Sequence, residues 1–264
     1  MHIIPLSASD LAIAAILVVL LALLSDRLGL GLGKRLMISA VRTTVQLLLV
    51  GLILRQLFGN FNIWLILTLA LVMILIAGRE IVIRQKVQVR GAYGYGVGVI
   101  SMAISSFAIA FFSLIVIIAV EPWYTPQYAI PLLGMLLGNT MTGISLATDR
   151  LTSDIYAQRN LIEQRLYLGE NWQTASEDIR KNAMRTGMIP IINSMAAAGI
   201  VSLPGTMTGQ ILGGSPPLEA VKYQILILFL IAAGTGFGVI VSIWLTSRNL
   251  FDKRYRLCLE KLKK

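Results

Sequence analysis

Long apolar runs separated by short polar segments make up most of this chain, and the pattern predicts membrane-spanning helices. A helix needs about 20 residues to cross a bilayer, and six continuous runs approach or exceed this length. They cover residues 11–24, 36–57, 63–78, 92–120, 128–148 and 221–245. A seventh run, residues 187–219, is apolar but is interrupted by prolines and glycines. We therefore expect an all-α, polytopic integral membrane protein with about seven transmembrane helices.

The seventh run cannot form one regular helix. Pro190 lies near its start, Pro204 and Gly205 lie in its middle, and glycines and prolines at 213–217 end it. In hydrocarbon, an interrupted backbone is tolerated only where protein buries it or where it lines a watery cavity. Such discontinuous spans point to a transport site, so Pro204 and Gly205 are candidates for a gating or structural role. The alternative is a kinked packing helix followed by an external loop.

A second stretch resembles part of this interrupted run. Residues 137–146 read LGNTMTGISL and residues 203–212 read LPGTMTGQIL, so both fit the pattern L-x-x-T-M-T-G-x-x-L. Internal repeats are a common basis for transporters, although ten residues can also match by chance. The predicted substrate pathway takes polar and methionine side chains from both regions: Asn139, Thr140, Met141, Thr142, Asn193, Ser194, Met195, Thr206, Met207, Thr208 and Gln210.

Arg42 and Gln46 lie four residues apart in the second run, so they share one face of a helix. A charge inside a span is costly and suggests a function, although Arg42 is close enough to the end of the run to reach the interface. We expect a structural or gating role for these two residues.

The composition agrees with a membrane protein and excludes several kinds of chemistry. The 264 residues are 56% hydrophobic and only 14% charged, whereas about a quarter of a soluble domain is charged. One histidine and one cysteine exclude a histidine-based zinc site, a Ser-His-Asp triad and a disulfide framework. No metal site can be assigned from the side chains. An ion path would depend on the asparagines and methionines named above and on backbone carbonyls, and such methionines more often serve packing.

The basic residues predict the topology. Residues 25–35, 79–90, 149–186 and 248–264 hold three, four, six and seven Lys or Arg, which is 20 of the 23 in the chain. The positive-inside rule places these segments in the cytoplasm, with the N-terminus outside and residues 248–264 as a basic cytoplasmic tail. This rule explains the net charge of +10 better than nucleic-acid binding does.

The segment 149–186 differs from the apolar runs because it is rich in charge of both signs. Leu151, Ile155, Ile162 and Leu166 recur in it at helical spacing. This spacing predicts one or two amphipathic helices outside the membrane, with Gly169 at the joint between them. They form either a solvated loop or a contact surface for a partner protein.

A nucleotide-binding loop is missing. The segment GLGLGKR at residues 29–35 has the wrong spacing for a phosphate-binding loop, since Leu28 stands where the first glycine is needed and Arg35 replaces the Ser or Thr. No other stretch fits better. We therefore expect that this chain does not hydrolyse ATP by itself.

Three stretches resemble the FetB-type family of ABC-transporter permeases. They are RTTVQL at 42–47, GMLLGNTMTGISLATDRL at 134–151, and the long block GMIPIINSMAAAGIVSLPGTMTGQILGGSPPLEAVKYQI at 187–225. Bacterial members of this family are described as iron exporters, and plant relatives are half-transporters linked to aluminium tolerance. The resemblance covers nearly the whole chain.

The resemblance implies a membrane subunit that works with a separate ATPase, which would bind ATP and magnesium, while this chain binds no cofactor. It favours the contact-surface interpretation of residues 149–186. The candidate coupling residues are Arg150, Arg165, Leu166, Tyr167, Glu170, Glu177 and Arg185.

We expect residues 1–264 to form a single permease domain in the inner membrane. It would be a homodimer in contact with lipid and two ATPase copies, exporting iron or a related metal ion. Two alternatives stay open at this point. One is an ABC permease for a sugar nucleotide or another organic solute, and the other is a secondary transporter that needs no ATPase.

Overall fold

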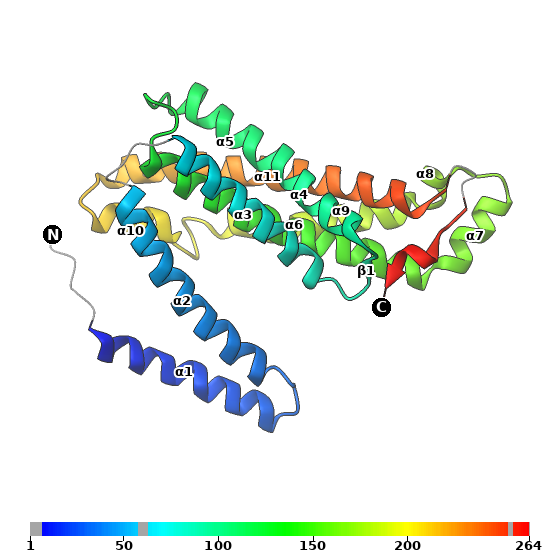
Figure 1. Ribbon diagram of the computed structural model, residues 1–264, viewed down its shortest axis with the longest axis horizontal. Helices are drawn as coiled ribbons and strands as arrows, with labels where there is room; N and C mark the ends of the chain where they lie inside the picture. The colour runs from blue at the N-terminus through cyan, green and yellow to red at the C-terminus, as the bar shows by residue number, and fades with distance from the viewer. Residues whose placement is uncertain (1–6, 58–62, 253–255, 264) are drawn as a thin grey trace. The chain divides into compact units, whose positions relative to one another are not determined.

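The computed structural model describes residues 7–57, 63–252 and 256–263, and it confirms the all-α class (Figure 1). The helices in chain order are α1 (Ala8–Arg27), α2 (Gly33–Leu57), α3 (Ile63–Ile83), α4 (Ala92–Met102), α5 (Ala108–Phe112), α6 (Pro126–Ala157), α7 (Arg159–Tyr167), α8 (Trp172–Ala175), α9 (Glu177–Ala197), α10 (Gly205–Leu212) and α11 (Pro217–Leu250). Two π-helical segments, Ala103–Phe107 and Ser113–Ile117, continue the path of α4 and α5. The strands β1 (Gln88–Val89) and β2 (Leu262–Lys263) have two residues each.

Six helical stretches of the described chain are long and apolar enough to cross a membrane. They are Ala8–Arg27, Gly33–Arg55, Ile63–Ile83, Ala92–Ile117, Pro126–Ala157 and Pro217–Leu250. They correspond to the six continuous runs of the sequence. The interrupted run forms the second half of α9 together with α10, so the expectation of about seven spans is consistent with the structure.

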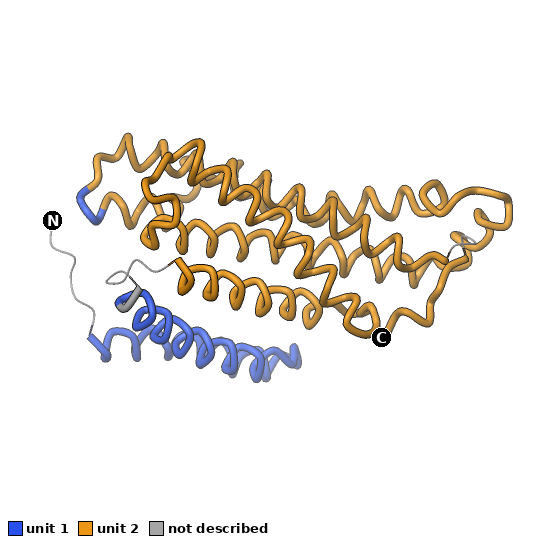
Figure 2. The backbone as a smooth tube through the Cα atoms, turned by 45° about the horizontal axis from the view of Figure 1, so that its top comes forward, with its two compact units in different colours: residues 1–62, 212–214 blue, residues 63–211, 215–264 orange. Residues whose placement is uncertain are grey.

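The chain divides into two compact units (Figure 2). The first comprises residues 1–62 and 212–214, and the second comprises residues 63–211 and 215–264. In the first unit, α1 begins with a capping box in which Ser7 and Asp10 satisfy each other's backbone N–H groups. Most apolar side chains of α1 and α2 are exposed, as expected for helices that contact lipid.

Helices α6, α9 and α11 form the core of the second unit. Buried side chains of α6 as far as Leu136 cluster with Ile191 of α9, whereas those from Leu137 onward cluster with Ile179 and Ala183. The two helices are therefore antiparallel. They approach most closely where Gly143 faces Gly187, because a Cβ on Gly187 would lie 2.7 Å from the Gly143 carbonyl oxygen and 2.7 Å from the Ala147 methyl group.

The charged segment 149–186 is helical, but its boundaries differ from the expectation. Helix α6 continues without a break to Ala157, and α9 already begins at Glu177. Between them, α7 ends at Tyr167, and Gly169 lies in the joint after it, as predicted, with a φ of +93° that glycine tolerates best. The N–H of Gly169 donates to the Leu166 carbonyl, and that of Glu170 donates to the Arg165 carbonyl. This pair of bonds is a Schellman motif, which stops the helix.

The C-terminal segment is not a free tail. Phe251 and Leu262 are buried in the core, and Phe251 stacks on Trp172 with ring centroids 5.6 Å apart. Strand β2 pairs antiparallel with β1 in the loop after α3, and the Arg90 N–H donates to the Lys261 carbonyl at 2.7 Å. A basic tail was expected because this segment is rich in Lys and Arg. Its few apolar side chains, however, pack against residues that are distant in the sequence.

Three of the four basic segments meet at one end of the second unit. The loop after α3 is fastened to α6 by the Lys86 N–H, which donates to the Asp149 carboxylate at 2.6 Å, and by Thr152, which donates to the Val87 carbonyl at 2.7 Å. The C-terminal segment joins the same end through β2 and Trp172. Such a meeting requires that all three segments lie on one side of the membrane, as the positive-inside rule predicts.

Cysteine labelling tests the orientation. In a Cys258→Ser background, Ser215→Cys in the turn before α11 is expected to react with an impermeant thiol reagent in intact cells. Gln158→Cys at the opposite, basic end is expected to react only after the membrane is permeabilised. Both native side chains are exposed, so accessibility within the protein is matched. Labelling of Gln158→Cys in intact cells would contradict the predicted orientation and would place this end of the protein outside the cell.

Candidate translocation site

The interrupted span has its break between α9 and α10, at residues 198–204. Pro190 does not break the helix, since α9 runs through it to Ala197. The chain then turns at Gly199, whose φ is +82°, and three successive N–H groups donate to the Ala197 carbonyl oxygen. The side chains of Ile200 and Val201 are 88% and 82% exposed. The prediction that this run cannot form one helix is therefore correct, and the unwound backbone is on the surface of the described chain.

A side-chain hydrogen bond joins α10, directly after the break, to α11. The Thr206 hydroxyl donates to the side-chain carbonyl of Gln224, which is only 7% exposed. Gln224 lies seven residues after the start of α11, which corresponds to about 10 Å along the helix. The sequence analysis missed Gln224, although a polar residue in an otherwise apolar span was a usable signal.

The two T-M-T-G stretches have different surroundings. The first lies in the middle of α6, where Thr140 is fully buried and Met141 packs on the core. The second lies at the start of the short helix α10, where Thr206 is exposed and Met207 and Thr208 are half-buried. The sequence similarity therefore does not extend to the tertiary environment.

Polar groups of α6 and α9 lie at the same end of their crossing. Because the helices are antiparallel, Asn139 lies about 6 Å before the Gly143–Gly187 contact, and Asn193 lies about 9 Å beyond it toward the same end. Both asparagines and Ser194 are exposed. Asn139 donates to the Met135 carbonyl at 2.8 Å, and Ser194 donates to the Pro190 carbonyl at 2.9 Å. Each of these two hydrogen bonds lies within the residue's own helix.

The remaining pathway candidates have more local roles. Thr142 donates to the Gly138 carbonyl at 3.0 Å, Thr208 donates to the Pro204 carbonyl at 3.3 Å, and Gln210 is half-buried. Met195 is half-buried and packs against the core cluster that contains Leu136 and Ile191. Arg42 and Gln46 are exposed on α2, which belongs to the first unit, whereas the other candidates belong to the second.

Side-chain metal ligands are scarce in this site. No group of three or more His, Cys, Asp or Glu that could hold a metal occurs within residues 7–57, 63–252 and 256–263. The oxygen atoms available at the break are backbone carbonyls, hydroxyls and amides.

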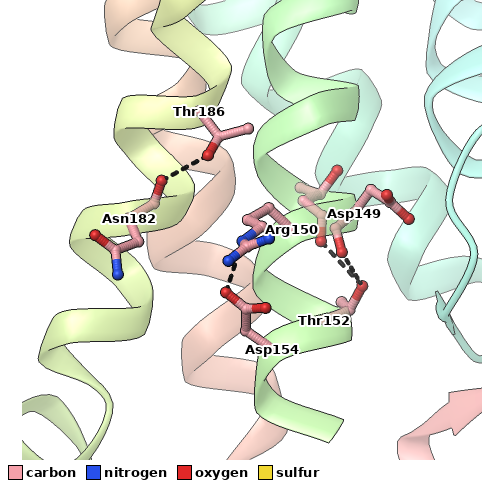
Figure 3. Close-up of polar contacts among 7 residues, drawn as sticks. Asp149, Arg150, Thr152, Asp154, Asn182 and Thr186 are labelled. Carbon is pink, nitrogen blue, oxygen red and sulfur yellow. Dashed lines mark hydrogen bonds and ion pairs between the residues drawn. The ribbon is translucent and has the colours of Figure 1, made fainter. Parts of the chain in front are cut away.

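The candidate coupling residues lie at the basic end of the second unit, and several form ion pairs. Arg150 and Asp154 pair at 2.7 Å on the side of α6 toward α9, whereas Asp149 and Thr152 lie on the other side of α6 (Figure 3). Arg165 pairs with Asp178 at 3.7 Å, which connects α7 to α9.

The ionisation of two groups in this region is shifted. Lys181 lowers the pKa of Glu177 through a hydrogen bond and its positive charge. Burial lowers the pKa of Arg180, whose guanidinium lies 5.3 Å from the Trp172 ring centroid. Glu170 is half-buried and Arg185 is exposed on α9.

The apolar coupling candidates differ in exposure. Leu166 is half-buried and packs on the protein's own core. Tyr167 and its neighbour Leu168 are 88% and 85% exposed at the end of α7. The helical spacing placed Leu166 on the apolar face, and that face turned out to be the internal one. Leu168 was missed because it follows the last helical turn.

Comparisons with known proteins agree with the resemblance seen in the sequence. The chain is 35% identical over 246 residues to Protein ALUMINUM SENSITIVE 3 of Arabidopsis thaliana, covering 92% of this chain and 88% of that protein. It is 30% identical over 255 residues to the probable iron export permease protein FetB of Escherichia coli, covering 97% and 96%.

A third relative is the UPF0014 membrane protein slr1647 of Synechocystis, 38% identical over 229 residues and covering 87% of this chain and 88% of that protein. No solved structure matches the chain. The model of the Uncharacterised protein family UPF0014 matches residues 8–251. The chain is therefore a multi-pass membrane protein that belongs to the UPF0014 family.

Proposed function

We propose that this chain is the membrane subunit of an ABC transporter that exports iron or a related metal ion. The observation that carries the proposal is the unwound segment 198–204, which interrupts an apolar run in a chain similar to a probable iron export permease. A break in an apolar run is a usual pointer to a transport site. The chain is proposed to act as a transport subunit and not as an enzyme.

A second copy of the chain would complete the pathway. Asn139 is exposed on α6, which is long and apolar enough to cross the membrane, and Asn193 and Ser194 are exposed on α9, which packs beside it; polar groups facing lipid are costly. A homodimer in which α6, α9 and α10 face their counterparts would remove these groups from lipid and place them along a central path. The substrate would then move between the two copies.

A cytoplasmic ATPase would supply the energy. The end formed by α7, α8 and the C-terminal segment presents Tyr167 and Leu168 outward, and exposed aromatic and aliphatic side chains are suited to anchor a partner. The ATPase would hold ATP and magnesium, and the permease would sit in the inner membrane with this end in the cytoplasm.

Transport by the reconstituted complex tests this function. The permease, purified with its candidate ATPase, is placed in liposomes and assayed for ATP-dependent movement of radiolabelled iron. We expect co-purification and movement of iron only when both subunits and ATP are present. Transport without the ATPase would favour a secondary transporter, and ATP-dependent transport of an organic solute but not iron would contradict the metal assignment.

Substitution of the two exposed asparagines tests the pathway. Asn139→Leu and Asn193→Leu are each expected to lower the transport rate about fivefold, since a polar contact contributes about 1 kcal/mol. The matched controls Asn139→Gln and Asn193→Gln retain the amide and should transport at a higher rate than the leucine variants. Abundance in the membrane, measured by quantitative immunoblot, should not change. Normal transport by both leucine variants would leave the asparagines with a packing role only.

A further inference from the structure

Arg248 lies in the last turn of α11, and its charge is not neutralised by the chain. Its guanidinium carbon lies 5.3 Å from the ring centroid of Trp244, one turn earlier in the helix. Among the residues that the structure describes, Arg248 forms no ion pair with a carboxylate. A guanidinium that stacks on a ring keeps the N–H donors in its own plane, in the fork geometry that matches a carboxylate or a phosphate. Arg248 is therefore available to an anion from outside the chain.

Two further basic side chains lie at the same end of α11. The Lys261 ammonium group donates to the Asn249 carbonyl at 2.6 Å, so it lies beside the residue that follows Arg248. The Arg90 N–H donates to the Lys261 carbonyl, and the Arg90 guanidinium donates to the Glu260 carbonyl at 3.4 Å. Three positive side chains therefore share this region with the single carboxylate of Glu260, and its net charge is positive.

Helix α4 contributes an aromatic side chain to this surface. The Tyr93 hydroxyl donates to the Leu245 carbonyl at 3.1 Å, which connects the start of α4 to the end of α11. Tyr93 and Trp244 are both exposed. Tyrosine and tryptophan are enriched where a span meets the lipid headgroups, because their rings are apolar and their polar atoms can be hydrated.

An exposed apolar stripe precedes Arg248 along α11. Phe237, Ile240 and Trp244 are 59%, 50% and 44% exposed, and together with Arg248 they recur three or four residues apart, on one face of the helix. Helix α11 is long and apolar enough to cross a membrane, and its continuous apolar run ends at Leu245. The stripe is thus suited to lipid chains, and Arg248 follows it directly at the end where headgroups are expected.

We propose that this surface of α4 and α11 binds an anionic phospholipid. Arg248 binds the headgroup phosphate, and Arg90 and Lys261 add positive charge. An acyl chain lies along Phe237 and Ile240. Basic sites between spans recognise anionic headgroups, so the net positive charge favours phosphatidylglycerol over zwitterionic phosphatidylcholine. The inference goes beyond the proposed function and depends neither on the transported substrate nor on an ATPase.

The alternative occupants fit this surface less well. A soluble anion would leave the apolar stripe unused. A second copy of the chain in the same membrane has the same orientation, so a symmetric contact through this stripe would bring the two positive ends of α11 together. A phospholipid supplies both the apolar chain and the negative charge.

Native mass spectrometry of the purified, full-length permease tests the site. The protein in detergent is titrated with phosphatidylglycerol or with phosphatidylcholine of the same acyl chains. We expect wild type to bind phosphatidylglycerol about fivefold more tightly, and Arg248→Gln to lose this preference. Arg248→Lys, which retains the charge but not the fork of donors, should lie between the two.

Arg84→Gln is the matched control. Arg84 is also an exposed arginine directly after a span, but its Nε atom lies 3.8 Å from the Glu80 carboxylate, so its charge already has a partner. Its affinity for phosphatidylglycerol should stay within about twofold of wild type. Because both arginines are on the surface, neither substitution should lower the amount of folded protein.

A phosphatidylglycerol with a diazirine in one acyl chain locates the bound lipid. After irradiation, mass spectrometry of peptides should find the label on α11 between residues 237 and 244, and Arg248→Gln should reduce this labelling about fivefold at limiting lipid. Equal affinity of wild type for the two lipids, equal losses in Arg248→Gln and Arg84→Gln, or labelling only outside α4 and α11 would each overturn the site. Disulfide-linked dimers of Phe237→Cys in a Cys258→Ser background would do so too, since a second copy would then cover the stripe. The comparison of lipids on wild type decides the matter even if a variant does not fold.

Discussion

The double substitution Tyr167→Asp and Leu168→Asp is expected to uncouple the permease from its ATPase while leaving its abundance unchanged. Both side chains are almost fully exposed, so charges there cost the folded permease little. In a docked complex the same two carboxylates would be desolvated without partners, at a cost of several kcal/mol. Association should therefore weaken a hundredfold or more. The measurements are the pull-down of the ATPase and the stimulation of ATP hydrolysis.

Leu166→Asp is the contrasting variant. Leu166 packs on the core cluster that contains Ile162 and Ile179, so a charge at this position should lower the amount of folded permease. Tyr167→Phe, which retains the ring, should bind the ATPase nearly as well as wild type. If the double aspartate variant bound the ATPase normally, the exposed end of α7 would have no part in docking, and residues 149–186 would serve only the fold of this chain.

Adding a methyl group at Gly187 is expected to destabilise the second unit. Its Cβ would lie 2.7 Å from the Gly143 carbonyl oxygen, 2.7 Å from the Ala147 methyl group and 3.0 Å from Val239. Because a backbone oxygen cannot move aside without shifting a helix, α6 and α9 must separate. Overpacking of this kind costs about 1–3 kcal/mol. For Gly187→Ala we expect a thermal midpoint in detergent lower by roughly 5 °C.

The same helix pair supplies the matched control. Gly138 lies on α6 five residues before Gly143, and nothing lies within 4 Å of the Cβ that alanine would add there. Gly138→Ala should therefore retain the wild-type midpoint, and Gly143→Ala should behave like Gly187→Ala because its Cβ would meet the Thr235 methyl group at 2.4 Å. Equal midpoints for Gly187→Ala and Gly138→Ala would mean that the two helices do not depend on this close approach.

The sequence alone determined the features that depend on neighbouring residues. The lengths of the apolar runs predicted the spans, because a helix must satisfy its own backbone groups wherever lipid surrounds it. Proline and glycine predicted that the seventh run is broken, and Gly169 predicted the joint after α7, because these residues act on local dihedral angles. The shortage of histidine, cysteine and deep carboxylates already indicated that any ion would meet neutral ligands.

Only the tertiary structure decided the features that depend on partners far apart in the chain. Helical spacing made Leu166 and Tyr167 equally plausible as contacts for an ATPase, but packing leaves Leu166 half-buried against the core and Tyr167 exposed. The same holds for Leu262, which pairs β2 with a loop more than 170 residues away, and for Thr206 with Gln224. Sequence periodicity assigns a side chain to a face of its helix, and only the other helices determine what that face contacts.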